Sequence, residues 1–72
     1  METPEQLAAI EKIKQQAAAH PLKPVLVSEH TSPAHGNFPE TRHLRYALTK
    51  NGRKMENIYN VTLDGKITVA QV

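Results

Sequence analysis

The sequence predicts an α+β protein in which one N-terminal helix packs on a small antiparallel sheet, in the order α-β-β-β-β. Three observations predict this class. A helix-forming segment with a capping signal comes first, two alternating segments flank Asn51-Gly52, and a further alternating segment follows Asp64-Gly65. Since the chain has 72 residues and no internal repeat, we expect residues 1–72 to form a single small domain.

The N-terminal segment predicts a helix over about residues 4–18. Thr3 can cap its start, Pro4 suits the first helical position, and Gln6 can complete a capping box by bonding back to the cap. An apolar stripe at helical spacing is expected to face the sheet. It comprises Leu7, Ile10, Ile13 or Lys14, and Ala17. The two prolines that follow residue 20 end the helix.

A short β-branched run, Val25 to Val27, predicts the first strand over about residues 24–30. Residues 30–40 contain two prolines together with glycine, serine and asparagine, and are predicted to be a loop. A loop this long in a compact domain is usually functional or disordered. The sequence does not determine where the first strand docks.

Asn51-Gly52 between alternating segments predicts a two-residue β-hairpin, because both turn residues of the favoured type adopt positive φ. Pairing outward from this turn places Thr49 opposite Lys54. One face of the hairpin is then apolar, and we expect it to form the core. Its members are Leu44, Tyr46, Leu48, Met55, Tyr59 and Val61.

The turn at Asp64-Gly65 is compatible with two loop lengths. A two-residue loop would place Ile67 and Val69 on the polar face. A three-residue loop (residues 63–65), with Gly65 in the left-handed conformation, buries both on the core face. We therefore predict the three-residue loop, which makes the last three strands a C-terminal meander.

Length and composition limit how the domain can be stabilised. A chain this short buries only about 60% of the surface that it exposes when unfolded, so its stability is marginal. Cysteine is absent, which excludes disulfides and thiolate zinc sites. Good packing and a homodimer remain as alternatives. No transmembrane helix or secretory signal is expected, and we expect a cytoplasmic protein of a bacterium or a phage.

Positive charge gathers on the central hairpin, although the net charge of the chain is only +2. No acidic residue lies between Glu40 and Glu56. A basic β-ribbon can enter the DNA major groove and neutralise phosphates, so one hypothesis is a nucleic-acid-binding module that uses residues 42–54. Its contacts would be Arg45, Lys50, Arg53 and Lys54. The alternative is that these charges maintain solubility and discourage aggregation at the sheet edge.

The leading hypothesis is a small non-enzymatic interaction or regulatory module that binds a protein partner through the loop 30–40 and the neighbouring hairpin. His35 and Phe38 would carry this binding. An exposed aromatic in a long loop can anchor a partner. Phe38 also has a simpler interpretation, which we favour, in which the ring folds back to cap the core.

We predict no enzymatic activity, metal or cofactor. The chain lacks a glycine-rich phosphate loop and a nucleophile elbow, and the pairing of Ser28 with His30 is one that any polar loop offers. A zinc site from His30, His35 and His43 is conceivable, but their spacing matches no ligand pattern. The order of elements is generic and indicates no particular family.

Overall fold

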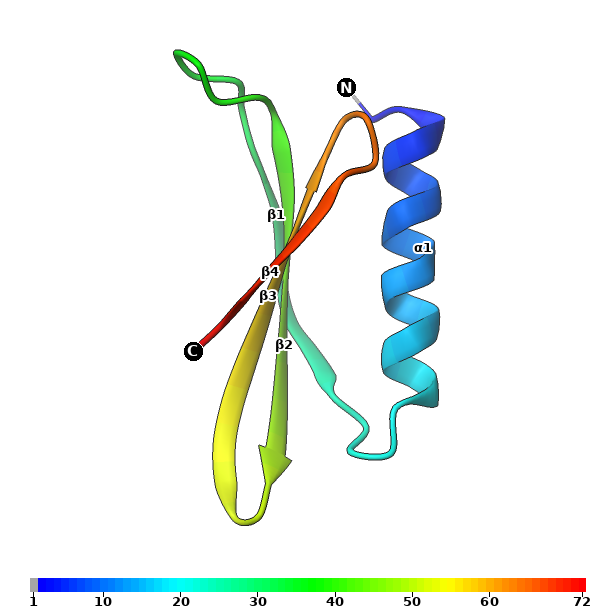
Figure 1. Cartoon of the computed structure of the whole chain (residues 1–72), viewed down its shortest axis with the longest axis vertical. Helices are drawn as coiled ribbons and strands as arrows, with labels where there is room; N and C mark the ends of the chain where they lie inside the picture. The colour runs from blue at the N-terminus through cyan, green and yellow to red at the C-terminus, as the bar shows by residue number, and fades with distance from the viewer. Residues whose placement is uncertain (1) are drawn as a thin grey trace.

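In a computed structural model, which describes residues 2–72, one helix covers one face of a four-stranded antiparallel sheet (Figure 1). The elements are α1 (Pro4–Ala19), β1 (Val25–Ser32), β2 (Thr41–Lys50), β3 (Arg53–Thr62) and β4 (Ile67–Gln71). The strands lie in chain order, β1-β2-β3-β4. The predicted α+β class and the order α-β-β-β-β are confirmed, and the first strand docks beside β2.

The start of α1 is capped as predicted, but Gln6 has a different role. The Thr3 hydroxyl accepts a hydrogen bond from the Gln6 backbone amide at 3.1 Å. The Gln6 side chain does not bond back to the cap. It is buried, and its Nε2 donates to the Val61 carbonyl of β3 at 3.0 Å. The prediction that the Gln6 side chain completes a capping box is therefore wrong. The side chain faces the sheet and donates to a carbonyl there instead.

The buried face of α1 keeps most of the predicted stripe but is shifted toward Gln6. Gln6, Ile10 and Ile13 are buried, and Ala17 packs partly against the core. Leu7, predicted to be buried, is 48% exposed. Consecutive helical residues point about 100° apart, so a contact line through Gln6 places Leu7 at its margin. No helix within residues 2–72 combines the length and apolar character needed to cross a membrane.

The β2–β3 hairpin has the predicted register throughout. Leu48 pairs with Met55 and Thr49 with Lys54, and Asn51 and Gly52 have φ of 54° and 77°. Both turn residues thus adopt the left-handed conformation that the Asn-Gly signal implies.

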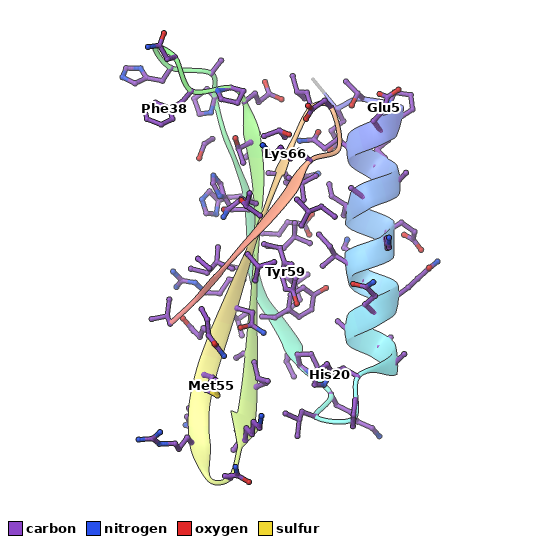
Figure 2. The ribbon with its side chains drawn as sticks, viewed as in Figure 1. Glu5, His20, Phe38, Met55, Tyr59 and Lys66 are labelled. Carbon is purple, nitrogen blue, oxygen red and sulfur yellow. The ribbon has the colours of Figure 1, made fainter. Side chains whose placement is uncertain are left out.

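Only part of the predicted core face is covered by α1. Leu44, Tyr46 and Val61 are buried, whereas Leu48 and Met55 are half-buried. The hairpin continues beyond the C-terminal end of the helix, where Met55 lies (Figures 1 and 2). The core is therefore confined to the half of the sheet beneath α1. Burial, followed by the nearby Glu29 carboxylate, raises the pKa of Tyr46 above its ordinary value.

The β3–β4 turn has the predicted three-residue loop, and it fits tightly against the start of α1. Thr62 N–H donates to the Lys66 carbonyl at 3.1 Å. Gly65 has φ of 85°, and a Cβ placed on it would lie 2.9 Å from the Glu5 carbonyl oxygen. The Thr3 hydroxyl also donates to the Leu63 carbonyl. This turn therefore holds the N-terminus of α1 against the sheet.

The expected burial of Ile67 and Val69 is wrong, although their register is right. Tyr59 pairs with Val69 and Val61 with Ile67, as predicted. Both side chains of β4 are nevertheless exposed, Val69 to 56%. The reason is the position of α1, which lies over β3 and leaves the edge strand β4 uncovered.

β1 is longer than predicted and ends at Ser32, so the loop shortens to residues 33–40. The strand pairs with β2 and contains an irregularity between Leu26 and Ser28. Ion pairs tie it to its surroundings: Glu29 lies 3.6 Å from Lys14 of α1 and 3.4 Å from Arg42 of β2.

Candidate interaction surfaces

Five of the six predicted site residues lie at two opposite ends of an elongated molecule. The extents are 40 × 22 × 16 Å, with the β1–β2 loop at one end and the β2–β3 turn at the other (Figure 1). Figure 2 shows Phe38 at the loop end and Met55 near the hairpin end. The structure therefore does not bring the loop and the basic turn together into one surface.

The loop between β1 and β2 ends in a small turn that presents Phe38. His35 N–H donates to the Phe38 carbonyl at 3.0 Å, and Phe38 N–H donates to the His35 carbonyl at 2.8 Å. Gly36 supplies the positive φ of 57° inside this turn. Phe38 is 75% exposed, so the expectation that it caps the core is wrong. The turn extends past the end of the sheet, away from α1, where no core exists for the ring to join (Figure 2).

The β2–β3 turn presents three cations. Lys50 and Arg53 are cross-strand partners next to Asn51-Gly52, and Lys54 lies opposite Thr49. All three cations are exposed, and within residues 2–72 none forms an ion pair. This end of the hairpin is a concentrated positive charge on a narrow two-stranded ribbon. We call Lys50, Arg53 and Lys54 the basic tip.

Arg45, the fourth predicted contact, does not belong to the basic tip. It lies inside the sheet, and its Nε is 3.6 Å from a carboxylate oxygen of Glu56. Arg42 is also paired, with Glu2 at 2.5 Å and with Glu29 at 3.4 Å. The positive stretch in the sequence therefore divides into two paired arginines within the sheet and the basic tip.

A shallow hollow lies beside the basic tip. Its volume is about 590 Å³. The lining is mixed and largely aliphatic: Val25, Ala47, Leu48, Thr49, Lys54, Met55, Glu56 and Val72. Residues from β1, β2, β3 and the end of the chain thus meet here, which the sequence could not indicate while the docking of β1 was unknown.

The histidines do not form the conceivable zinc site. His30 and His43 stack with ring centroids 4.8 Å apart, whereas His35 belongs to the turn that presents Phe38. The described residues contain no cluster of three or more metal-binding side chains that could hold an ion. His43 is instead held at both ring nitrogens, by Ser32 Oγ at 2.7 Å from Nε2 and by Asn60 Oδ1 at 2.6 Å from Nδ1.

Ser32, His43 and Asn60 form a hydrogen-bonded row across β1, β2 and β3 that the sequence analysis missed. The hairpin register already placed His43 opposite Asn60, but Ser32 joined them only once β1 was docked. The residue types resemble a catalytic arrangement, with a hydroxyl as nucleophile, an imidazole as base and an amide that orients the imidazole. Acyl transfer also needs oxyanion donors and a substrate pocket. None of the three residues lines the hollow beside the basic tip, and the row links the strands.

Comparison of the chain with protein-family models, with curated proteins and with solved structures found no match. The function has to be argued from the two ends of the molecule described above.

Proposed function

We propose that this chain is a small, non-enzymatic interaction module of the cytoplasm that binds a protein partner through the turn presenting Phe38. The observation that carries the proposal is the exposure of this aromatic ring on a closed turn. Two backbone hydrogen bonds and a left-handed glycine fix the turn before any partner arrives. A ring that is already positioned loses little conformational entropy on binding, which favours an anchoring role.

The structure narrows the surface that the sequence suggested for this partner. The basic tip lies at the far end of the sheet, so the proposal uses the loop 33–40 without Lys50, Arg53 or Lys54. Phe38 would enter a pocket of the partner, and His35, its partner in the turn, would contribute a polar contact at the rim.

A capture experiment tests this proposal. Immobilised wild-type chain, Phe38→Ala and the doubly reversed Arg53→Glu/Lys54→Glu are exposed to a lysate of the source cell. A partner should be retained by wild type and by the charge-reversed chain but lost by Phe38→Ala. With the purified partner, Phe38→Ala should weaken binding by at least about tenfold, as expected for an aromatic anchor. Retention by Phe38→Ala would contradict the proposal.

A second candidate function is nucleic-acid binding by the basic tip. It is favoured by one observation, which is that these three cations have no acidic partner among the described residues, whereas Arg42 and Arg45 do. Three phosphate contacts on duplex DNA predict a slope of log affinity against log salt of about −3. The exposed tip also fits the alternative that the charges only keep the ribbon soluble.

Fluorescence anisotropy with a short DNA duplex distinguishes these two roles of the tip. The variant Lys50→Gln/Arg53→Gln/Lys54→Gln should lose binding and its salt dependence. The matched control Lys12→Gln/Lys23→Gln/Lys66→Gln removes the same charge from exposed sites elsewhere and should retain most of the affinity. Equal weakening by both variants would show that only net charge matters, which would contradict a site at the tip.

A further inference from the structure

The two edges of the sheet are built differently. β1 has a pairing irregularity between Leu26 and Ser28, carries Glu29, and is flanked by Pro24 and Pro33. These features discourage another strand from pairing with an edge. β4 (Ile67–Gln71) has none of them, because it is regular, uncharged, free of proline and rich in β-branched residues. It is the unprotected edge of this sheet.

Three residues of β4 have backbone N–H and C=O groups that point toward this open edge. Val72 and Glu56 exchange both backbone hydrogen bonds, at 2.9 and 3.1 Å, and the Lys66 carbonyl accepts from Thr62 N–H. In an antiparallel ladder, the backbone N–H and C=O groups of alternate residues point toward the partner strand. The backbone groups of Thr68 and Ala70 therefore also point toward β3. The N–H and C=O groups of the residues between them point outward; these residues are Ile67, Val69 and Gln71.

The chain also exposes more surface than a compact monomer of its size. Its accessible surface is 5187 Å² for a mass of 8.0 kDa, whereas folded monomers of that mass expose about 4450 Å². The excess of about 700 Å² is of the same order as the roughly 800 Å² that each partner buries in a standard interface. The fully formed core contains only six apolar side chains among the described residues, all at the contact between α1 and the sheet. A second copy paired along β4 would bury part of this excess surface.

We propose that β4 pairs antiparallel with β4 of a second copy, about a two-fold axis at Val69, joining the two sheets into one. In this register Val69 faces Val69 of the other copy, and Ile67 faces Gln71 of the other copy. Every outward backbone group of these three residues is then hydrogen-bonded. A shift by one residue turns the bonding groups out of phase, and a shift by two leaves some of them unpaired.

Side chains agree with this self-pairing. The two copies of Val69, each 56% exposed in the single chain, become neighbours on the helix side of the joined sheet. No charged side chains oppose each other across the axis, because residues 67–72 carry none. A strand from an unrelated protein could use the same backbone groups. The excess surface and the symmetric register favour a second copy, and this inference is independent of the function proposed for Phe38.

Sedimentation velocity on charge variants of Val69 tests the pairing. Wild type should sediment at twice the chain mass of 8.0 kDa. Val69→Lys and Val69→Glu should each be monomeric, since two like charges would face each other across the axis. An equimolar mixture of the two variants should recover the dimer. The matched control Val27→Lys, on the other edge at a side chain 52% exposed, should remain dimeric.

Amide hydrogen exchange on wild type provides a measurement that needs no variant. The amides of Ile67, Val69 and Gln71 should become protected as protein concentration rises, while those of Thr68 and Ala70, bonded within the chain, should be protected at all concentrations. A monomeric wild type would overturn the proposal. Dimeric Val69→Lys, a mixture that stays monomeric, or loss of the dimer in Val27→Lys would each overturn the assignment to β4.

Discussion

The two halves of the β2–β3 hairpin carry the same alternating pattern, yet only one of them is a core. Leu44 and Val61, in the half beneath α1, are completely buried. Leu48 and Met55 continue the same apolar face and are only half-buried. The difference lies outside the hairpin, in where α1 ends. An alternating pattern thus indicates which face can be buried, and the neighbouring element decides how much of that face is.

The half of the hairpin that α1 covers is also the half where the start of α1 contacts the sheet. Gln6 bonds to Val61, the Thr3 hydroxyl donates to the Leu63 carbonyl, and Gly65 lies against Glu5. These contacts fix α1 from its N-terminus, and its 16 residues then end short of the hairpin turn. The following predictions test this division, with all stabilities compared at one protein concentration because association shifts them.

The largest effect is expected from shortening a leucine in the covered half. Leu44→Ala should lower the free energy of unfolding by about 3 kcal/mol, because it leaves a cavity in a fully buried site. Leu48→Ala removes the same atoms from the same face four residues along and should cost only about 1 kcal/mol. Urea titration followed by circular dichroism measures both. Equal losses would show that the two halves are equally packed.

Glycine at the two ends of β3 gives the next comparison. Gly65→Ala should cost about 2 kcal/mol, since alanine meets both an unfavourable positive φ and the Glu5 carbonyl. Gly52→Ala has a similar φ but open space around its Cβ, and should cost about 1 kcal/mol. Thermal unfolding should separate the two variants by several degrees in a domain of this size. A Gly52→Ala loss as large as that of Gly65→Ala would contradict close packing at the α1 end.

Removing the Gln6 hydrogen bond should have a smaller effect. Gln6→Leu keeps a buried side chain of similar size but leaves the Val61 carbonyl without this donor, so we expect a loss of about 1 kcal/mol. Gln16→Leu makes the same chemical change on the exposed face of α1 and should be nearly neutral. Denaturant titration of both variants checks this. A Gln6→Leu variant as stable as wild type would mean that packing alone places α1.

The smallest effect is a pH dependence at the β3–β4 turn. Hydrogen bonds from the Thr62 hydroxyl, and then from the Lys66 amide, lower the pKa of the exposed Asp64 carboxyl. The ionised Asp64 carboxylate therefore contributes to the free energy of unfolding. This contribution is complete above the pKa of Asp64 in the unfolded state, and it is lost as pH falls through the lower pKa of the folded state. Wild type should therefore exceed Asp64→Asn in stability at pH 6, and the two should converge near pH 2. A difference that is constant with pH would exclude this role.

Local chemistry made much of the fold predictable. Asn51-Gly52 determined the register of the whole hairpin, and the need to place Ile67 and Val69 on one face selected the three-residue loop. The Thr3 cap was equally local. What could not be predicted depends on long-range placement: the docking of β1, the donor role of Gln6, and the exposure of Val69.

In the candidate sites, too, features set by the local sequence could be predicted and features set by long-range placement could not. Exposure of Lys50, Arg53 and Lys54 follows from their position at a turn, so the basic tip was visible in the sequence. The distribution of charge did not reveal that Arg45 faces Glu56, because that contact crosses strands diagonally. Phe38 was misplaced because composition cannot show on which side of the sheet a loop ends.

The strand order has a consequence for how the chain folds. Every strand pairs with its neighbour in sequence, so the sheet can be built by successive closure of short loops. The contact between Gln6 and Val61, separated by 55 residues, is different, because it closes nearly the whole chain. The hairpins should therefore form early and the helix should dock late. Stopped-flow measurements on Gln6→Leu should then show faster unfolding with an almost unchanged folding rate.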